Sequence, residues 1–133
     1  MRNIKIIILA TILSTVNTGL LASDGLKIVP LIKLIVEPQK FDNNRVSAVG
    51  VYKFDIDSST LYLTKEHFIA DIFDTSISVE LPKNFKLVDL PSLEKLNGKY
   101  VQITGTFDAD EKGYMGLNQG TLKEVEKISF YAK

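Results

Sequence analysis

The 133-residue sequence contains no cysteine. Disulfides are therefore excluded, and so is a lipid anchor attached to a cysteine behind a signal sequence. Only one histidine, His67, is present. Zinc-type metal sites need several histidine, cysteine or carboxylate ligands, so we predict that His67 is exposed to solvent and is neither a metal ligand nor a catalytic base.

The motifs that usually indicate catalysis are also missing. The sequence has no Gly-x-Ser-x-Gly elbow and no glycine-rich phosphate loop. Its glutamates alternate with lysines, which is typical of a solvated surface and not of a carboxylate pair in a shared cleft. We therefore predict a protein that is not an enzyme and that carries no cofactor and no metal.

The chain has no excess of basic charge, because lysine plus arginine and aspartate plus glutamate number 16 each. Without residues 1–23, which include Arg2 and Lys5, the chain has 14 basic and 16 acidic residues. Proteins that bind nucleic acid usually present a basic patch or groove. A nucleic-acid-binding role is therefore the least favoured of the binding roles.

The N-terminal segment has the order of regions found in a secretory signal peptide. Arg2 and Lys5 precede a short apolar run at residues 6–13, and a softer stretch leads to Ala22 and Ser23. We predict a signal peptide over residues 1–23 and a periplasmic or secreted bacterial protein. The alternative is an uncleaved membrane anchor over residues 4–22, which is close to the minimum length for a spanning helix.

The motif Val-x-x-x-Gly-x-aromatic occurs twice, at residues 46–52 and 101–107. Each copy follows an apolar residue and a polar turn, and each alternates like a strand. A glycine inside a strand favours a bend, and small closed barrels need bent strands. The repeat therefore predicts barrel architecture, with both glycines on inward faces and Tyr52, Phe54 and Phe107 in the core.

The remaining pattern predicts a mainly β protein: a five-stranded OB-like Greek-key barrel with one short helix over residues 38–133. Its strands are expected at residues 45–54, 60–64, 76–81, 99–108 and from 120 onward, with a first return at 114–119. The helix is expected at 89–98, where Asp89 can cap. Residues 24–37 form a lead-in segment or edge strand, with β-rich residues at 31–36. Residues 65–74 fit either a helix or a loop.

Several short pieces carry a family resemblance. These are Pro38-x-x-Phe41, the two glycine motifs, Leu61-Tyr62-Leu63 and a hairpin at Gly113. In this pattern the chain resembles small exported bacterial OB-fold-like proteins of unassigned function. The resemblance implies a fold and an exported location, and it implies no catalytic residues.

Residues 108–113 resemble the front of a calcium-binding loop, with acids at the first and third places and Gly113 at the sixth. The fifth place is Lys112, however, and the twelfth is Gln119 where a bidentate glutamate is needed. Glycine and aspartate are also good turn residues. We therefore interpret the segment as a hairpin turn.

These observations favour an exported, non-enzymatic binding module that acts on a protein, a glycan or a small ligand. The expected ligand face lies on the outer side of the first three strands, with these candidate residues: Lys53, Tyr62, Glu80 and Tyr100. The alternative is a periplasmic immunity or inhibitor protein that blocks a toxin or hydrolase. Both alternatives fit a small exported chain without a catalytic constellation.

Overall fold

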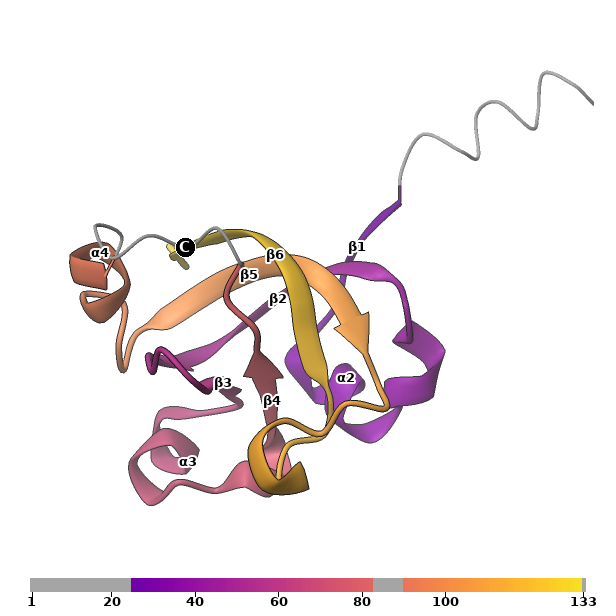
Figure 1. Cartoon of the computed structure of the whole chain (residues 1–133), viewed down its shortest axis with the longest axis horizontal. Helices are drawn as coiled ribbons and strands as arrows, with labels where there is room; N and C mark the ends of the chain where they lie inside the picture. Colours follow the sequence, from indigo (N-terminus) through magenta and orange to yellow (C-terminus); the bar gives the residue numbers. More distant parts are fainter. Residues whose placement is uncertain (1–24, 83–89, 133) are drawn as a thin grey trace, which may run out of the picture.

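The structure is a computed structural model that describes residues 25–82 and 90–132 (Figure 1). The predicted signal peptide and the predicted cap at Asp89 lie outside the described residues. The described elements are, in chain order, β1 (Leu26–Ile28), α2 (Leu31–Val36), η1 (Pro38–Phe41), β2 (Arg45–Lys53), β3 (Ser59–Tyr62), α3 (Lys65–Ala70), η2 (Phe73–Thr75), β4 (Ser76–Val79), α4 (Leu90–Glu94), β5 (Tyr100–Asp108), η4 (Tyr114–Gly116) and β6 (Thr121–Phe130). Within these residues, no helix has the length and apolarity needed to cross a membrane.

Five strands close into a barrel. The sheet runs β1-β2-β3-β4-β6-β5, and an additional pairing of β2 with β5 closes it. Strands β4 and β6 pair in parallel, whereas β2 pairs antiparallel with both β3 and β5. Strand β1 is an extra edge strand, parallel to the start of β2. The prediction of a mainly β, five-stranded OB-like Greek-key barrel is confirmed.

The two motif glycines lie where neighbouring backbones come close. A Cβ atom on Gly50 would lie 2.7 Å from the carbonyl oxygen of Tyr62, and one on Gly105 would lie 2.7 Å from that of Lys123. The pairing of β5 with β6 shifts register between Thr104 and Thr106, next to Gly105. Glycine is therefore required at both positions by the close approach of a partner strand.

The barrel interior holds the core. Strand β5 alternates as predicted, with Val101, Ile103, Gly105 and Phe107 buried and the residues between them partly exposed. In contrast, β3 and β4 are buried at every position. Their outer face is therefore covered, and the elements that cover it form the candidate site described below.

Residues 31–36 form the helix α2, so the predicted strand is wrong there. Leu31 and Leu34 are buried, whereas Ile32 and Val36 are exposed, which is the three-residue spacing of a helix. The segment is apolar at nearly every position, and its pattern therefore fits both the period of a helix and the period of a strand. Leu31 settles the choice by packing against the bend at Gly50, where no side chain competes for the space.

The barrel carries more helix than the one predicted short helix. Residues 65–70 form α3, whose Thr64 side chain accepts a hydrogen bond from the backbone N–H of His67. Another difference lies at residues 114–119, which do not begin the return strand. Residues 114–116 form a short 3₁₀ turn instead, and β6 begins at Thr121.

Candidate functional site

A small cavity of about 100 Å³ lies on the outer side of β2 and β3. Three chain segments meet around it: the β2–β3 turn, the start of η2 and the β5–β6 loop. Its lining residues are Lys53, Asp55, Ser58, Thr60, Phe73, Tyr114, Leu117 and Asn118. We call these residues, together with the exposed Ile56 and Met115 in the same loops, the loop-end surface.

The β5–β6 loop has an unusual backbone. Gly113, Met115 and Gly116 all have positive φ angles, of 72°, 57° and 69°. Glycine adopts this region readily, but for methionine it is uncommon and strained. Gly113 also allows close packing, since a Cβ there would lie 2.9 Å from the Cβ of Ser78 and would clash with the side chain of Asn118. The turn therefore has a defined shape.

The base of this loop is tied to the barrel by hydrogen bonds. The buried Asn118 donates through Nδ2 to the Ser76 hydroxyl at 2.8 Å, and its backbone N–H donates to the Lys112 carbonyl at 2.8 Å. The N–H of Gln119 donates to the carbonyl of Ser76 at 2.9 Å. Because the base is anchored, the tip is presented in a fixed place.

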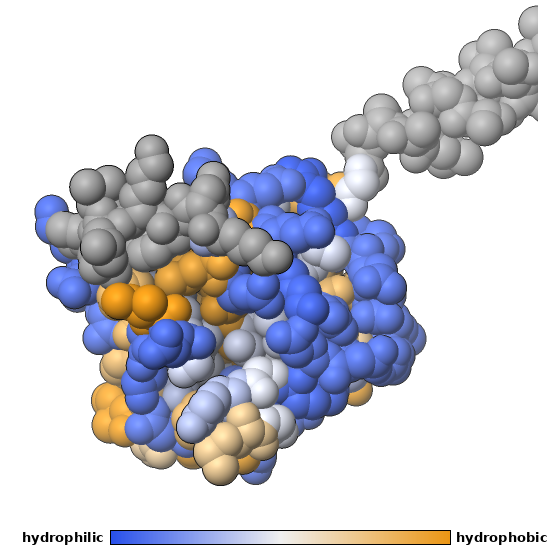
Figure 2. Space-filling model, in the orientation of Figure 1, coloured by the Kyte–Doolittle hydropathy of each residue, from blue (hydrophilic) through white to orange (hydrophobic). Residues whose placement is uncertain are grey.

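The tip itself faces solvent. Tyr114 is 72% exposed and Met115 is 76% exposed, and Ile56 and Leu117 are also exposed. Figure 2 shows some hydrophobic residues, mixed with hydrophilic ones, at the lower edge of the molecule, where Figure 1 places α3 and the β5–β6 loop. Apolar residues at an anchored, solvent-facing tip contribute little to the core, and they are typical of an interaction surface.

A buried tyrosine supports the wall of the cavity. The Tyr62 hydroxyl donates to Asp71 Oδ1 at 2.9 Å, and Lys53 Nζ lies 2.6 Å from the same oxygen. Burial, and then the hydrogen bond to Asp71, raise the pKa of Tyr62 above its usual range. The bonds from Lys53 and Tyr62 lower the pKa of the Asp71 carboxyl. The ring of Tyr62 also contacts those of Phe68 and Phe73, which holds α3 and η2 over the sheet.

The four predicted ligand-face residues have different surroundings. Lys53 lines the cavity, and Tyr62 lies behind it, linked to Lys53 through Asp71. Tyr62 is buried and not exposed on this face, because α3 and η2 cover it. Glu80 is exposed just past β4, where its N–H bonds to Leu122, and Tyr100 is half-exposed beneath Lys65.

Sequence reasoning missed most of the cavity. Phe73 is far along the chain from Leu117 and Asn118, and only the folded barrel brings them together. One signal was present in the sequence: two glycines, Gly113 and Gly116, flank an apolar pair in a turn. Such a pattern indicates a tight turn that projects its central side chains.

His67 is half-buried, and the prediction of a solvent-exposed histidine is therefore wrong in part. Its Nδ1 atom lies 2.6 Å from the Thr75 hydroxyl, so the ring ties the middle of α3 to the end of η2. This contact is structural, since it joins the two elements that cover Tyr62.

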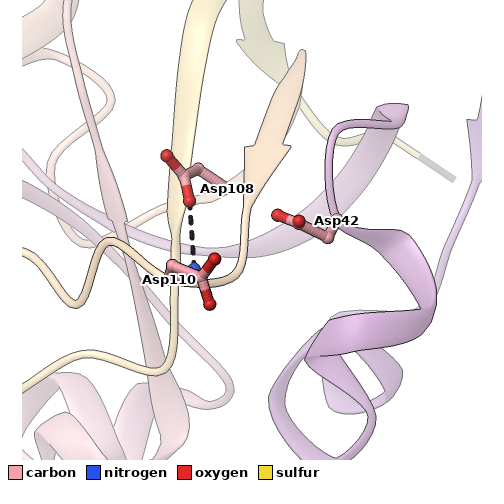
Figure 3. Close-up of side chains that lie close together, drawn as sticks. All are labelled: Asp42, Asp108 and Asp110. Atoms are coloured by element: carbon pink, nitrogen blue, oxygen red, sulfur yellow. Dashed lines mark hydrogen bonds between the residues drawn. The ribbon is translucent and has the colours of Figure 1, made fainter.

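Three carboxylates approach one another elsewhere, at the end of β5. Asp42, Asp108 and Asp110 have oxygens within 4.8 Å of one another, and Figure 3 shows them facing a common space. The sequence pattern included Asp108 and Asp110 but not Asp42.

Protein donors already engage each of these three carboxylates. Asp42 accepts a hydrogen bond from the N–H of Ala109, and Asp110 accepts one from the side chain of Gln39. Asp108 accepts hydrogen bonds from the N–H groups of Asp110 and Glu111, and it pairs with Lys123 at 3.0 Å. The cluster therefore closes the turn and joins it to the start of β2. Among the described residues, these three carboxylates lie close enough together to hold a cation.

Comparisons with known proteins found few matches for this chain. No protein-family model and no curated protein matches it. Among solved structures, it is similar to the crystal structure of a DUF3299 family protein from Pseudomonas aeruginosa, with 11% sequence identity and a TM-score of 0.45. The match covers 71% of this chain and 65% of that protein, just under two thirds of its length. The resemblance to exported OB-fold-like proteins stays a prediction.

Proposed function

We propose that this chain is an exported, non-enzymatic binding module, and that it binds a protein partner through the loop-end surface. The observation that carries the proposal is the anchored β5–β6 loop, which presents Tyr114 and Met115 to solvent beside a cavity. A bacterial periplasmic or extracellular location follows from the predicted signal peptide.

The size of this cavity favours a single side chain of a partner over a whole small ligand at the loop-end surface. Sites for small molecules usually enclose about 300–1,000 Å³. The cavity here is about 100 Å³, which is room for one side chain. A partner would therefore place one residue in the cavity and rest the surrounding surface on the exposed tip.

The residue types at the tip also favour a protein partner. Aromatic residues and methionine are enriched at protein–protein interfaces, and hot spots form where such side chains surround a pocket.

Site-specific photo-crosslinking in the producing bacterium tests the proposal. A photoreactive phenylalanine analogue replaces Met115 in one strain and Phe130, an exposed aromatic at the end of β6, in another. We expect a discrete protein adduct from position 115 and none of the same mass from position 130. Excess wild-type protein should compete the adduct away.

A matched competitor gives the experiment its control. The double variant Tyr114→Ser/Leu117→Ser should fail to compete, whereas Phe130→Ser/Tyr131→Ser should compete as the wild type does. An adduct that forms equally at both positions, or that the loop variant removes as well as the wild type, would refute the proposed surface.

A second proposal, an inhibitor or immunity protein, uses the same surface. It is favoured by the strained φ of Met115, because a rigid projecting turn suits insertion into the cleft of a toxin or hydrolase. Loss of the partner's enzymatic activity on binding would support inhibition over simple binding.

A further inference from the structure

The chain segments that surround the loop-end surface have an excess of acidic residues that the whole chain does not have. These segments, residues 53–60, 71–75 and 112–119, contain four aspartates and two lysines, whereas the full sequence is neutral. The aspartates are Asp55, Asp57, Asp71 and Asp74, and all four are exposed. A concentration of one charge sign around a cavity favours a partner of the opposite sign.

Both lysines of these segments already have partners. Lys53 pairs with Asp71 at 2.6 Å, and Lys112 donates to the carbonyl oxygen of Gln119 at 3.0 Å. Within residues 25–82 and 90–132, Asp55, Asp57 and Asp74 form no salt bridge. Among the described residues, the charge of these three carboxylates is therefore not offset by a salt bridge.

The cavity combines a carboxylate with aromatic and aliphatic walls. Asp55 lines one side, with the hydroxyl-bearing Ser58 next to it, and Phe73, Tyr114 and Leu117 supply the apolar part. Long basic side chains lay their methylene stems along apolar surface while the charged head reaches a polar group. The face of an aromatic ring also attracts a cation.

We propose that the cavity receives an arginine or lysine side chain from a protein partner. The inference rests on the proposed function and specifies the chemistry of the same surface. A nucleic acid is disfavoured here, because its phosphates would face the same carboxylates. A basic segment of a secreted protein fits the charge, the apolar walls and the one-side-chain volume together.

Three short peptides test whether the cavity prefers a positively charged side chain. Each peptide is added to ¹⁵N-labelled protein that the cell has exported and that has then been isolated. The peptides are acetyl-Gly-Ala-X-Ala-Gly-amide, in which X is arginine, norleucine or glutamate. Binding is followed by amide chemical shifts. We expect the arginine peptide to shift the amides of residues 55–58, 73 and 113–118. The norleucine and glutamate peptides should bind at least about threefold more weakly, as expected for a partly screened ion pair.

A matched pair of variants tests the carboxylate. Asp55→Asn keeps the oxygen that accepts the N–H of Asp57 at 3.0 Å, so the turn is retained while the charge is removed. Glu94→Gln removes an exposed charge on α4 and serves as the control. Asp55→Asn should weaken arginine-peptide binding about threefold or more, and Glu94→Gln should leave it unchanged.

The outcomes separate the charge inference from the proposed function. Norleucine binding as strong as arginine binding, shifts outside the named residues, or no binding of any peptide would overturn the cationic inference. The crosslinking pattern at residue 115 would still decide whether the loop-end surface binds a protein. Failure of crosslinking alone would remove the proposed function and leave a cavity for basic side chains without a protein partner.

Discussion

The glycines of the barrel and those of the β5–β6 loop serve opposite purposes. Gly50 and Gly105 are buried and allow neighbouring strands to approach closely. Gly113 and Gly116 have positive φ angles and turn the chain outward, so that the side chains between them face solvent. The difference separates a scaffold, where exposure would be costly, from a surface, where apolar residues are displayed at little cost to stability.

Core truncation should give the largest contrast between these two regions. Phe107→Ala removes a fully buried ring from the barrel, and it should lower the free energy of unfolding by about 3–5 kcal/mol. Tyr114→Ala removes a ring of similar size from the loop-end surface and should change stability by less than about 0.5 kcal/mol. Urea denaturation of both variants measures the contrast. Equal losses would show that the loop tip belongs to the core.

A glycine substitution tests the scaffold with a smaller effect. Gly105→Val places a side chain against the carbonyl oxygen of Lys123 and should cost about 1–3 kcal/mol, because the core has no room for added atoms. Gly25→Val is the control, since a Cβ there meets nothing within 4 Å. Thermal melts of the two variants give the comparison. An unchanged melting temperature for Gly105→Val would contradict the close approach of β5 and β6.

Removing the hydrogen bond behind the cavity should have a smaller effect on the free energy of unfolding. Tyr62→Phe removes the hydrogen bond to Asp71 and should cost about 1 kcal/mol, a value discounted because Asp71 is half-exposed. Since the Tyr62 pKa is raised on folding, its contribution is complete below the ordinary tyrosine pKa of about 10 and is lost as pH rises above it. Wild-type stability should therefore fall more steeply above pH 10 than that of Tyr62→Phe. Parallel pH profiles would show that Tyr62 is not perturbed.

The smallest change in stability is expected at acid pH. Folding lowers the pKa of Asp71, so its contribution is present above the ordinary aspartate pKa near 4 and is lost as pH falls below it. The variant Lys53→Met removes the main cause of the shift and should flatten this acid dependence. Stability measured between pH 2 and pH 6 checks the prediction, and an unchanged slope in Lys53→Met would contradict it.

The strands were predictable because alternation is a local property. Val101, Ile103 and Phe107 are buried in turn, and the pattern can be found without knowledge of any other element. The structure of residues 31–36 was not predictable, because a run of apolar residues fits a strand and a helix equally. What decides between them is Leu31 against Gly50, a contact between segments about twenty residues apart.

The candidate site was predictable only in part, for the same reason. Lys53 could be placed on the outer side of β2 from alternation alone. The burial of Tyr62 depends on Phe68 and Phe73, which cover it only after α3 folds back over the sheet. The cavity needs three segments to converge, and a single sequence contains no local signal of such convergence.

The affinity of two matched double variants for the crosslinked partner tests the central claim most directly. Tyr114→Ser/Leu117→Ser changes the loop-end surface, and Phe130→Ser/Tyr131→Ser changes exposed aromatics at the end of β6. The first should weaken binding by at least about tenfold, which is 1.4 kcal/mol, and the second should leave the dissociation constant unchanged. Unchanged binding by the loop variant together with weakened binding by the β6 variant would place the partner on the other side of the barrel and contradict the account.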